Sequence, residues 1–600
     1  MKKKAFISVT DKSNLDVLVK GLSRHDYEII STGGTAKRIR EIIEKNNCKT
    51  KLVEVSDFTE FPEIFEGRIK SLHPKILGGI LCDWNNVLHK KEAEQNKIVP
   101  IHMVVVNLYE FEKTAAIEGV KEEEVIEAID IGGPTAIICA VKNHKHVAVV
   151  TDPDSYSLII DELDRNKGNI SLETKRKLAA FASNMIADYR DVIAVELSKR
   201  LAGEQSIRQK FVKGKQLGRY GENWHQRAWL FVDEKTKEKN VVSAKQVNGP
   251  PMGFNNYIDA ASALEIVKQF KQPCAVVVKH NNPCGIATSD SLVNALERAW
   301  QSDPVSAFGS VIAFNRDVDL KTIKVICERT NPQGKKGWFV EVMIAPRFDK
   351  EALEYVRTLK TKKNLRMLEL GDFSKEQREQ FAYKHILGGL LKQERDLKLY
   401  LTDIDDLFRE PHVVHDNVSG KDLTVGVVTK RKPDKSKKGL FDFAQKACKG
   451  VKSNSIVIVR EYSLGKYQLL GMGAGQPNRI VSVKLALEKA KENLESEYRV
   501  INKKAQDFEN AILATEYDGL IKKGREVKSF TKEEYVNQKL RGCVLASDSF
   551  FPFEDSIELL AESITQIIQP GGSNRDAEII KVADKENIVM VFSGTRHFLH

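Results

Sequence analysis

A lysine and a histidine stand side by side at Lys279 and His280, directly after the apolar run Cys274–Val278. The run predicts a buried strand, and Pro283 and Gly285 predict an irregular loop after it. Open α/β sheets place ligand sites at strand ends. Histidine moves protons near neutral pH, and a neighbouring lysine can stabilise negative charge or hold the histidine neutral. The pair therefore predicts proton transfer, although a strand that simply ends in two polar residues remains an alternative.

Two glycine turns, each between a predicted strand and a predicted helix, could bind an anion. Residues 31–35 (STGGT) separate a strand predicted at 27–30 from a helix predicted at 36–44, and residues 570–574 (PGGSN) precede a helix predicted at 576–583. Such turns present free backbone N–H groups at the positive end of a helix dipole. The spacing matches neither a Walker A loop nor G-x-G-x-x-G, so a triphosphate or dinucleotide is not implied. A plain capped turn is the alternative interpretation.

Two basic residues, Arg68 and Lys70, alternate with an apolar one. On extended chain they would face the same side and could clamp an anion, although a solvated edge is the usual meaning of such a pair. His73 and His89 lack the spacing of metal ligands, and neither H-E-x-x-H nor C-x-x-C occurs. We therefore expect no metal site.

The elements that must position these residues alternate between strands and helices. Strands are predicted at 5–9, 27–30, 103–108 and 147–150, with a helix at 14–22 after the first of them. This alternation is typical of a doubly wound α/β unit with a parallel sheet.

Length and composition set the broad class. A chain of 600 residues is too long for one core, so two or more domains are expected. The net charge of +11, from 94 basic and 83 acidic residues, is a mild excess that suits small anionic molecules and does not require nucleic acid. Eight scattered cysteines favour a reducing compartment, and no apolar stretch predicts a signal peptide or a membrane span. We expect a soluble cytoplasmic protein without nucleic-acid or membrane partners.

Several short motifs occur in one characteristic order. They are ISVTDK, STGGTAK, GRIKSLHP, NLY, IDIGGPT and KNH in the first part, then RYGENWHQ, VNGPPMGFNN, DPVSAFGSVIAFN, GMGAGQ and SGTRHFLH. In these motifs the chain resembles the bifunctional purine-biosynthesis family, in which an aminoimidazole carboxamide ribonucleotide (AICAR) transformylase is joined to an inosine monophosphate (IMP) cyclohydrolase.

The resemblance implies an α/β fold in three parts. Residues 1–152 would form the cyclohydrolase domain, similar to methylglyoxal synthase, and 153–215 a helical connector. Residues 216–600 would form the transformylase domain, built from subdomains similar to cytidine deaminase. Residues of about 492–540 are expected to be a helical, solvated insertion, for which partner binding remains an option.

The resemblance also assigns residues to the cyclohydrolase site. Lys70, Tyr109, Asp130 and Lys142 would be catalytic, with Lys142 as the proton-transfer group. The nucleotide contacts would be Thr10, Asp11, Lys12, Thr32, Gly33, Gly34, Thr35, Arg68, Ile69, Ser71, Asn107 and Ile131.

In the transformylase part, Lys279 and His280 match the family's catalytic pair. Substrate contacts would be Arg219, Tyr220, Gly309, Glu341, Asn454, Arg479, Ile480, Phe550, Asp555, Ser573, Asn574 and Arg596. Trp224 stands where the family has proline, and Ser310 where it usually has glycine, which could point to a weakened transformylase.

The implied function is the last two steps of IMP synthesis. The implied co-substrate is 10-formyltetrahydrofolate, without a redox cofactor but with a possible structural monovalent cation, and the implied assembly is a homodimer. Two alternatives stay open: only one of the two activities survives, or the chain is a non-catalytic nucleotide-binding regulator. A zinc deaminase is excluded, because Ala287 stands where its P-C-x-x-C motif needs a second cysteine.

Overall fold

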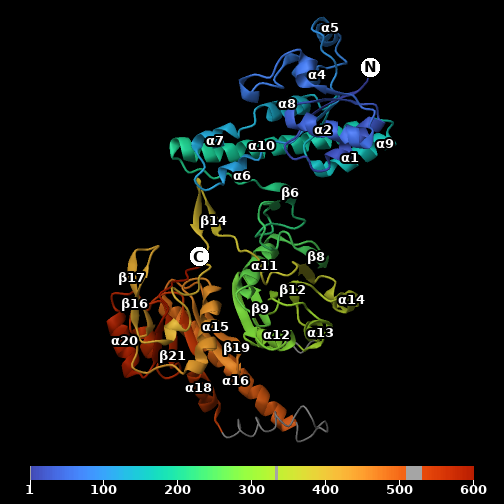
Figure 1. Cartoon of the computed structure of the whole chain (residues 1–600). Coiled ribbons are helices and arrows are strands. Elements are labelled where there is room, and N and C mark those ends of the chain that lie inside the picture. Colours follow the sequence, from blue (N-terminus) through green and yellow to red (C-terminus); the bar gives the residue numbers. More distant parts are fainter. Residues whose placement is uncertain (1, 331–335, 508–529) are drawn as a thin grey trace. The chain divides into compact units, whose positions relative to one another are not determined.

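The computed structural model describes residues 2–330, 336–507 and 530–600 (Figure 1). The chain divides into two units, Met1–Lys210 and Phe211–His600. Each unit has its own sheet and its own cores, and each is described separately below.

The first unit is built on a five-stranded sheet in the order β3-β2-β1-β4-β5, in which all neighbouring strands are parallel. The strands are β1 (Lys4–Ser8), β2 (Glu28–Ser31), β3 (Leu52–Glu54), β4 (Met103–Val106) and β5 (Ala148–Val150). The doubly wound parallel sheet predicted from the sequence is therefore confirmed. Because β1 lies between β2 and β4, the strand order reverses there, and ligands bind at such a point in open α/β sheets.

Helices cover both faces of this sheet, as the apolar strands require. The helices of the first unit are α1 (Leu15–Arg24), α2 (Gly33–Asn46), α3 (Val55–Thr59), α4 (Pro74–Leu81), α5 (Val87–Gln95), α6 (Phe111–Ala115), α7 (Glu122–Glu127), α8 (Gly132–Lys142), α9 (Tyr156–Arg165) and α10 (Leu172–Ala202). One core packs α1, α2 and α9 against the sheet, and the other packs α4, α8 and α10 against it.

The helix α10 is an integral part of the first unit. Its residues Ala179, Ala182 and Ile186 are buried in the second of these cores. Most of the connector expected at 153–215 thus folds with the first unit, which extends to Lys210.

The second unit is built on a mixed sheet of thirteen strands. The sheet order is β16-β17-β22-β21-β20-β18-β19-β10-β9-β11-β12-β13-β8. In chain order these strands are β8 (Lys245–Asn248), β9 (Cys274–Lys279), β10 (Asn282–Thr288), β11 (Ser310–Phe314), β12 (Val340–Ala345), β13 (Arg366–Glu369), β16 (His412–Asp416), β17 (Lys421–Val427), β18 (Ile456–Ser463), β19 (Lys466–Gly473), β20 (Val544–Ser547), β21 (Gln566–Gln569) and β22 (Val589–Phe592).

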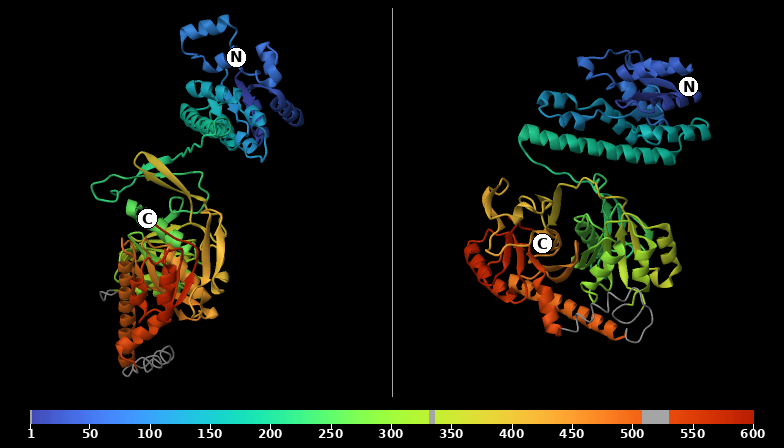
Figure 2. Two further views of the ribbon diagram at one scale, coloured as in Figure 1. Left: turned by 90° about the vertical axis from the view of Figure 1, so that its left-hand side faces the viewer. Right: turned by 60° about the horizontal axis from the view of Figure 1, so that its bottom comes forward.

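The two halves of this sheet repeat one pattern. In the first half β9 pairs antiparallel with β10 and β11, and β12 and β13 follow in parallel. In the second half β18 pairs antiparallel with β19 and β20, and β21 and β22 follow in parallel. The halves meet where β10 and β19 run antiparallel (Figure 2, green and orange-red).

Helices flank each half in the same order. They are α11 (Phe254–Val267), α12 (Leu292–Gln301), α13 (Leu320–Glu328) and α14 (Lys350–Thr358) in the first half, and α15 (Lys438–Lys449), α16 (Arg479–Asp507), α18 (Lys532–Arg541), α19 (Asp555–Leu560) and α20 (Asp576–Lys585) in the second. One shared core contains α11 and α15, and each half has a separate core on the opposite face of the sheet.

Two small antiparallel sheets complete the second unit. They are β6 (Val212–Gln216) with β7 (Trp229–Val232), and the hairpin of β14 (Phe381–Ile386) with β15 (Gly389–Glu394). The tip of the second hairpin, Leu387, is fully exposed.

Residues expected to be an insertion, about 492–540, are helical where the structure describes them. The helix α16 continues to Asp507, and α18 buries Tyr535, Val536 and Leu540 in the core of the second half. The described ends of this region therefore pack one face into the core and expose the other. Residues 508–529 lie outside the described part of the chain.

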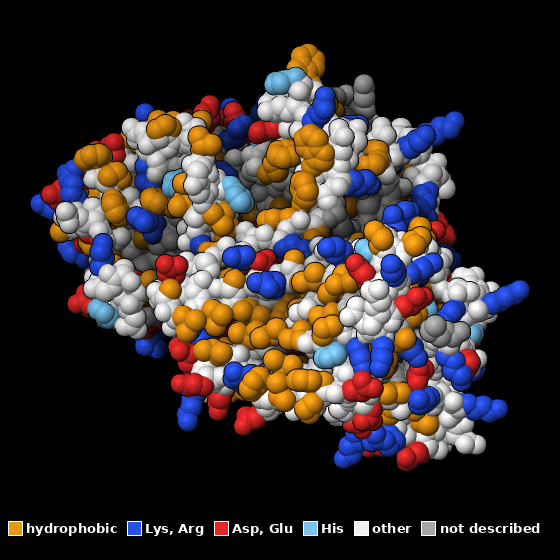
Figure 3. Space-filling view, turned by 90° about the horizontal axis from the view of Figure 1, so that it is seen from above, with side chains coloured by type: hydrophobic (Ala, Val, Ile, Leu, Met, Phe, Trp, Pro, Cys, Tyr) orange, Lys and Arg blue, Asp and Glu red, His pale blue; other side chains and the backbone are white. Residues whose placement is uncertain are grey.

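Positive and negative side chains are mixed on the surface, in line with the modest net positive charge. On the face seen in Figure 3, Lys and Arg side chains are interspersed with Asp and Glu. Among the described residues, none of the helices combines the length and the apolar character needed to cross a membrane.

Candidate active sites

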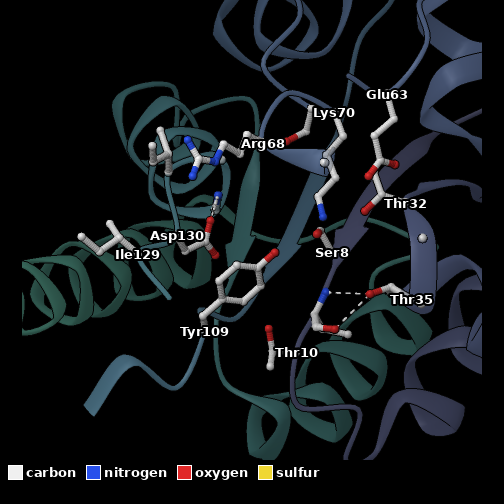
Figure 4. A pocket seen from close by; sticks show the side chains of 18 of the residues that line it. Ser8, Thr10, Thr32, Thr35, Glu63, Arg68, Lys70, Tyr109, Ile129 and Asp130 are labelled. Atoms are coloured by element: carbon white, nitrogen blue, oxygen red, sulfur yellow. Dashed lines mark hydrogen bonds between the residues drawn. The ribbon is translucent and has the colours of Figure 1, made fainter. Parts of the chain in front are cut away.

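A cavity of about 550 Å³ opens at the carboxyl ends of β1, β2 and β4 in the first unit (Figure 4). Most of the predicted cyclohydrolase residues line it: Thr10, Lys12, Thr32, Gly33, Gly34, Thr35, Arg68, Lys70, Ser71, Asn107, Tyr109, Asp130 and Ile131. Figure 4 shows the Lys70 ammonium and the Tyr109 hydroxyl pointing into the same space. The structure does not place Asp11, Ile69 or Lys142 among the lining residues.

The predicted anion seat lies at the start of α2. Thr32 is the extended N-cap and the helix begins at Gly33, whose φ of 45° favours glycine. A Cβ on Gly33 or Gly34 would meet nothing within 4 Å, and both residues line the cavity, so the start of α2 is open to it. The Thr35 hydroxyl is already used, because it accepts from the Val9 N–H at 3.1 Å and donates to the Val9 carbonyl at 2.9 Å.

Asn107 holds the loop after β1. Its Oδ1 accepts from the backbone N–H groups of Thr10 and Asp11 at 2.6 and 3.0 Å, and its Nδ2 donates to the Asp11 carbonyl at 2.8 Å. The Asp11 carboxylate accepts from the Ser13 N–H at 2.8 Å, and hydrogen bonds from Ser13 lower the pKa of Asp11. The predicted contacts Asn107 and Asp11 therefore shape the rim of the cavity.

The segment carrying Arg68 and Lys70 is not extended, so the shared-face argument for it was wrong. A 3₁₀ turn at Phe65–Gly67 precedes Arg68, which itself has helical backbone angles. Both basic side chains reach the cavity all the same. Arg68 is paired with Glu127: Nε donates to Oε1 at 3.3 Å and Nη2 donates to Oε2. This hydrogen bond raises the pKa of Arg68 and lowers that of Glu127.

Three carboxylates in the lining were not singled out from the sequence: Glu63, Glu66 and Glu127. They lie among other acidic residues in the chain, and no motif distinguishes them.

Asp130 is the most constrained acid of the cavity. Its Oδ1 accepts from the Gly133 N–H at 2.8 Å, and its backbone N–H donates to the Tyr189 hydroxyl at 2.8 Å. Burial raises the pKa of Asp130, against hydrogen bonds and Lys70, which lower it. A side chain at Gly133 would clash with the Asp130 carboxylate, with a Cβ only 2.5 Å from Oδ2.

Lys142 lies at the far end of α8 from the cavity. Gly132 and Gly133 line the cavity at the start of this 11-residue helix, which is roughly 16 Å long at the usual rise per residue. The next residue, Asn143, donates from Nδ2 to the carbonyls of Ile80 and Cys82 at 2.6 and 2.9 Å. In this structure the KNH motif thus anchors α8 to α4.

In the second unit, Lys279 and His280 occupy a tight hairpin and not an irregular loop. His280 and Asn281, with φ of 53° and 60°, form the two-residue turn between β9 and β10, as in a type I′ turn. Pro283 and Gly285 lie inside β10, at a register shift. The turn exposes His280, while the Lys279 ammonium donates to the Phe308 carbonyl at 2.8 Å.

Two predicted contacts lie near this turn on the first half of the sheet. Gly309 follows Phe308, has a φ of 76° and donates its N–H to the Phe339 carbonyl. The Glu341 carboxylate accepts from Arg366 Nη1 at 2.8 Å, so it is already neutralised by a buried arginine.

The loop bearing the predicted contacts Arg219 and Tyr220 adjoins α11. Carbon atoms of Arg219 lie 3.9 Å from where a Cβ on Gly253 would be. Tyr220 is half exposed, and Trp224, the residue that replaces the family's proline, is 84% exposed. Ser310, the other departure, is buried with its hydroxyl unpaired among the described residues.

The second half brings Asn454 and Arg479 together. Arg479 donates to Asn454 Oδ1 at 2.6 Å, to Ser547 Oγ at 2.8 Å and to Asp548 Oδ1 at 2.5 Å. Asn282 Oδ1 accepts from the Lys452 N–H at 3.1 Å. This contact links the β9–β10 hairpin of the first half to the segment that carries Asn454.

The carboxyl terminus joins this cluster. The His597 N–H donates to the Asp548 carbonyl, and the Ser453 N–H donates to the Leu599 carbonyl. The predicted contact Arg596 stacks on the Phe598 ring at 4.4 Å, and Ile480 is the second residue of α16.

The second predicted anion seat is filled by the chain itself. The N–H groups of Gly572 and Ser573 both donate to Asp576 Oδ2, at 2.7 and 3.1 Å. Burial raises the pKa of Asp576. Ser573 and Asn574 lie between β21 and α20. Phe550 lies between β20 and α19, and Asp555 is the first residue of α19. The strands β20 and β21 are parallel neighbours. In this structure these two N–H groups are therefore used by Asp576, and the anion seat with Ser573 and Asn574 as contacts stays a prediction.

These features define an α/β protein with a candidate site in each unit, one of them a cavity beside the start of α2. A family model described as the MGS-like domain matches residues 14–135, and one described as the AICARFT/IMPCHase bienzyme matches residues 140–489. The chain belongs to this bienzyme family and is a bifunctional AICAR transformylase and IMP cyclohydrolase of purine biosynthesis, which uses a folate-derived formyl donor.

Relatives match over their whole length. Two proteins named "Bifunctional purine biosynthesis protein PurH" are 38% identical over 607 residues (Persephonella marina) and 39% identical over 602 residues (Lactobacillus acidophilus), each with full coverage of both chains. A solved structure described as the crystal structure of ForH is 27% identical and covers 32% of this chain and 96% of that chain. Its TM-score of 0.29 is too low to bear on the fold.

Proposed function

We propose that the cavity of the first unit is the cyclohydrolase site and that the Lys279–His280 turn belongs to the transformylase site. The observation that carries the first assignment is the convergence of Lys70, Tyr109 and Asp130 on one cavity beside a free helix N-terminus. The open backbone at Gly33 and Gly34 suits the phosphate of a ribonucleotide.

Ring closure follows from these groups. The carboxamide nitrogen of formyl-AICAR attacks the formyl carbon and a C–N bond forms. The carboxamide nitrogen and the formamide nitrogen each give up one proton, and the C–O bond breaks as the formamide nitrogen forms a C=N bond. The formyl oxygen leaves with both protons as water. No atom changes oxidation state overall, so the step needs no redox cofactor. We assign Lys70 and Tyr109 to polarise and protonate the formyl oxygen, and Asp130 to receive a proton from nitrogen. The assignment is supported by the three side chains lining one cavity.

Lys142 remains a proposed proton-transfer group through the resemblance, although it does not line the cavity. Ring closure that survives Lys142→Ala, with transformylation also unchanged, would remove it from the mechanism.

In transformylation the AICAR amine is a weak nucleophile, because its lone pair is shared with the ring and the amide. We assign His280 as the base that removes the amine proton and Lys279 as the cation that stabilises the developing formyl oxyanion. The lysine must leave the Phe308 carbonyl to do so.

His280→Ala should lower transformylase kcat by about 10²- to 10⁴-fold, because a positioned general base is lost. Tetrahydrofolate release measures this step, and IMP formation from pre-formylated substrate is the control, since it should not change. Transformylation within two-fold of the parent protein would contradict the assignment.

We propose a homodimer. The turn that carries His280 is exposed, as are Tyr383, Ile386 and Leu387 of the β14–β15 hairpin. A second copy of the chain would cover such apolar side chains and close the site. Light scattering of the purified protein tests this assembly.

We also propose a cytoplasmic location, which the eight free cysteines support. A structural monovalent cation, which the resemblance implies, belongs to the same proposal. Asp548 has a fully buried carboxylate, the kind of group that could bind a cation. This carboxylate already accepts hydrogen bonds from Arg479 and Ser453, so its charge is already compensated. We therefore give the cation no step, and thermal stability in potassium and in choline chloride tests for it.

One experiment separates the remaining alternatives. Purified protein is mixed with AICAR and 10-formyltetrahydrofolate, and tetrahydrofolate and IMP are followed separately. Both products should appear. IMP formed only from pre-formylated substrate would mean that Trp224 or Ser310 has impaired the transformylase. Binding of nucleotide with neither product would indicate a regulator.

A further inference from the structure

Tyr189 connects the long helix α10 to the cyclohydrolase cavity. It lies three residues after the buried Ile186, so it continues the helix face that packs on the sheet. Its hydroxyl accepts the backbone N–H of Asp130 at 2.8 Å. Tyr189 is absent from the lining of the cavity and lies in a neighbouring groove, on the other side of Asp130. Tyr189 therefore contacts the backbone of Asp130, the proposed catalytic acid, and does not line the cavity in which the substrate would bind.

The same ring also braces the turn that carries Tyr109. Phe111 is buried and packs edge-on against Tyr189, with ring centroids 6.5 Å apart and an interplanar angle of 77°. The Phe111 N–H donates to the Tyr109 carbonyl at 2.9 Å. One side chain of α10 thus contacts both segments from which the acid and the phenol enter the cavity.

Asp130 depends on this contact for its place. Its carboxylate is fixed from the other side by the Gly133 N–H at 2.8 Å. The Tyr189 hydroxyl is the acceptor for the Asp130 N–H, and an unpaired N–H in this half-buried position would be costly.

We propose that Tyr189 is a positioning residue for ring closure, holding the Asp130 backbone and the Tyr109 turn at a fixed separation. The proposal rests on the assignment of this cavity as the cyclohydrolase site. The sequence predicts α10 only as part of a connector. The proposal makes this helix a direct contributor to the cyclohydrolase activity.

The test is Tyr189→Phe, which keeps the ring against Phe111 and removes only the acceptor. We expect ring-closure kcat to fall about ten-fold, with KM for formyl-AICAR changed less than about two-fold, because the phosphate seat is untouched. Transformylase activity of the same sample should be unchanged and serves as the internal control. Tyr27→Phe is the matched control, since Tyr27 lies beside the amino end of β2, away from the cavity.

The pH profile gives a second readout. Lys70, Tyr109 and Tyr189 are titratable groups close to Asp130. The cavity is also lined by Lys12, Glu63, Glu66, Arg68 and Glu127, and the neighbouring groove by Arg190. Burial holds the pKa of Asp130 above its ordinary value. A looser Asp130 is better hydrated, so the acid limb of ring closure should move to lower pH in Tyr189→Phe.

A double-mutant cycle distinguishes positioning from a general loss of structure. Asp130→Asn keeps the backbone N–H, so Tyr189→Phe should cost little more in that background. Full additivity, or a Tyr189→Phe protein with parental kcat and pH profile, would overturn the proposal. If Asp130→Asn alone left ring closure intact, the assignment of the cavity would fail instead.

Discussion

At the scale of single residues, the phosphate cavity contains its own counter-ion. Glu127 pairs with Arg68, and both side chains are well exposed, so the pair is easily exchanged for another anion. A substrate phosphate that binds Arg68 must displace Glu127. If Arg68 binds the substrate phosphate as proposed, we expect the glutamate to weaken binding of the nucleotide while it keeps the arginine in place.

Glu127→Gln should tighten nucleotide binding by about two- to five-fold, the size expected of an exposed ion pair. The measurement is KM for formyl-AICAR together with inhibition by IMP, with kcat nearly unchanged. Glu41→Gln is the matched control, because Glu41 forms a similarly exposed pair with Arg38 on the surface of α2. A weaker affinity in Glu127→Gln would show that the glutamate holds Arg68 for the phosphate rather than competing with it.

The sequence could predict residues that sit in local motifs. Thr32, Gly33 and Gly34 form a turn between a strand and a helix, so their backbone role follows from neighbouring residues. Glu127 and Tyr189 could not be found in this way, because each acts on a partner 59 residues distant in the chain. Only the fold brings such partners together.

At the scale of elements, the β9–β10 hairpin determines how the proposed catalytic pair, Lys279 and His280, is presented. A two-residue turn with positive φ at His280 and Asn281 fixes the histidine at a strand end. Asn281 is held in turn, since its N–H donates to Asp259 and its Oδ1 accepts from Ser262. The sequence predicted the strand β9 but not this hairpin, because Pro283 and Gly285 indicate loops when their pairing partners are unknown.

Gly285 shows why glycine is required inside β10. A Cβ there would lie 1.9 Å from the Ala299 carbonyl oxygen of α12. Gly285→Ala should therefore destabilise the second unit by about 1–3 kcal/mol, the usual cost of overpacking. Chemical denaturation measures the loss.

Gly218→Ala is the control for this change, because a Cβ on Gly218 meets nothing within 4 Å. Equal denaturation midpoints for the two variants would contradict the close approach of β10 and α12.

At the scale of the whole molecule, the first unit contains everything that the proposed cyclohydrolase site needs. The cavity is lined by residues between Ser8 and Gly133, and Tyr189 lies on α10, which ends at Ala202. A fragment of residues 1–210 should therefore close the ring with kcat within about three-fold of the full chain, as expected of an independently folding domain.

A fragment of residues 1–170, which lacks α10, is the informative comparison. It should lose ring closure, because both the core packing of α10 and the Asp130–Tyr189 contact are missing. Ring closure by the shorter fragment at the same rate would show that α10 is dispensable.

The resemblance implied that residues 216–600 consist of α/β subdomains, but not the strand pairing that joins them into one thirteen-stranded sheet. The apolar strands and their flanking helices are visible as local patterns. The equivalence of the two halves is a matter of pairing order, which local patterns do not encode. The meeting of β10 and β19 joins Ala287 to Gln468, far apart in the chain.

That long-range pairing has a kinetic consequence. Each half can form its own hairpin, β9–β10 or β18–β19, from nearly adjacent residues, and such contacts close in microseconds. The β10–β19 pairing forms only when a loop of well over a hundred residues closes. The entropy cost of closing this loop slows folding. We therefore expect the second unit to assemble as two preformed halves that dock late. Until they dock, the β10 and β19 edges remain open to pairing with other chains.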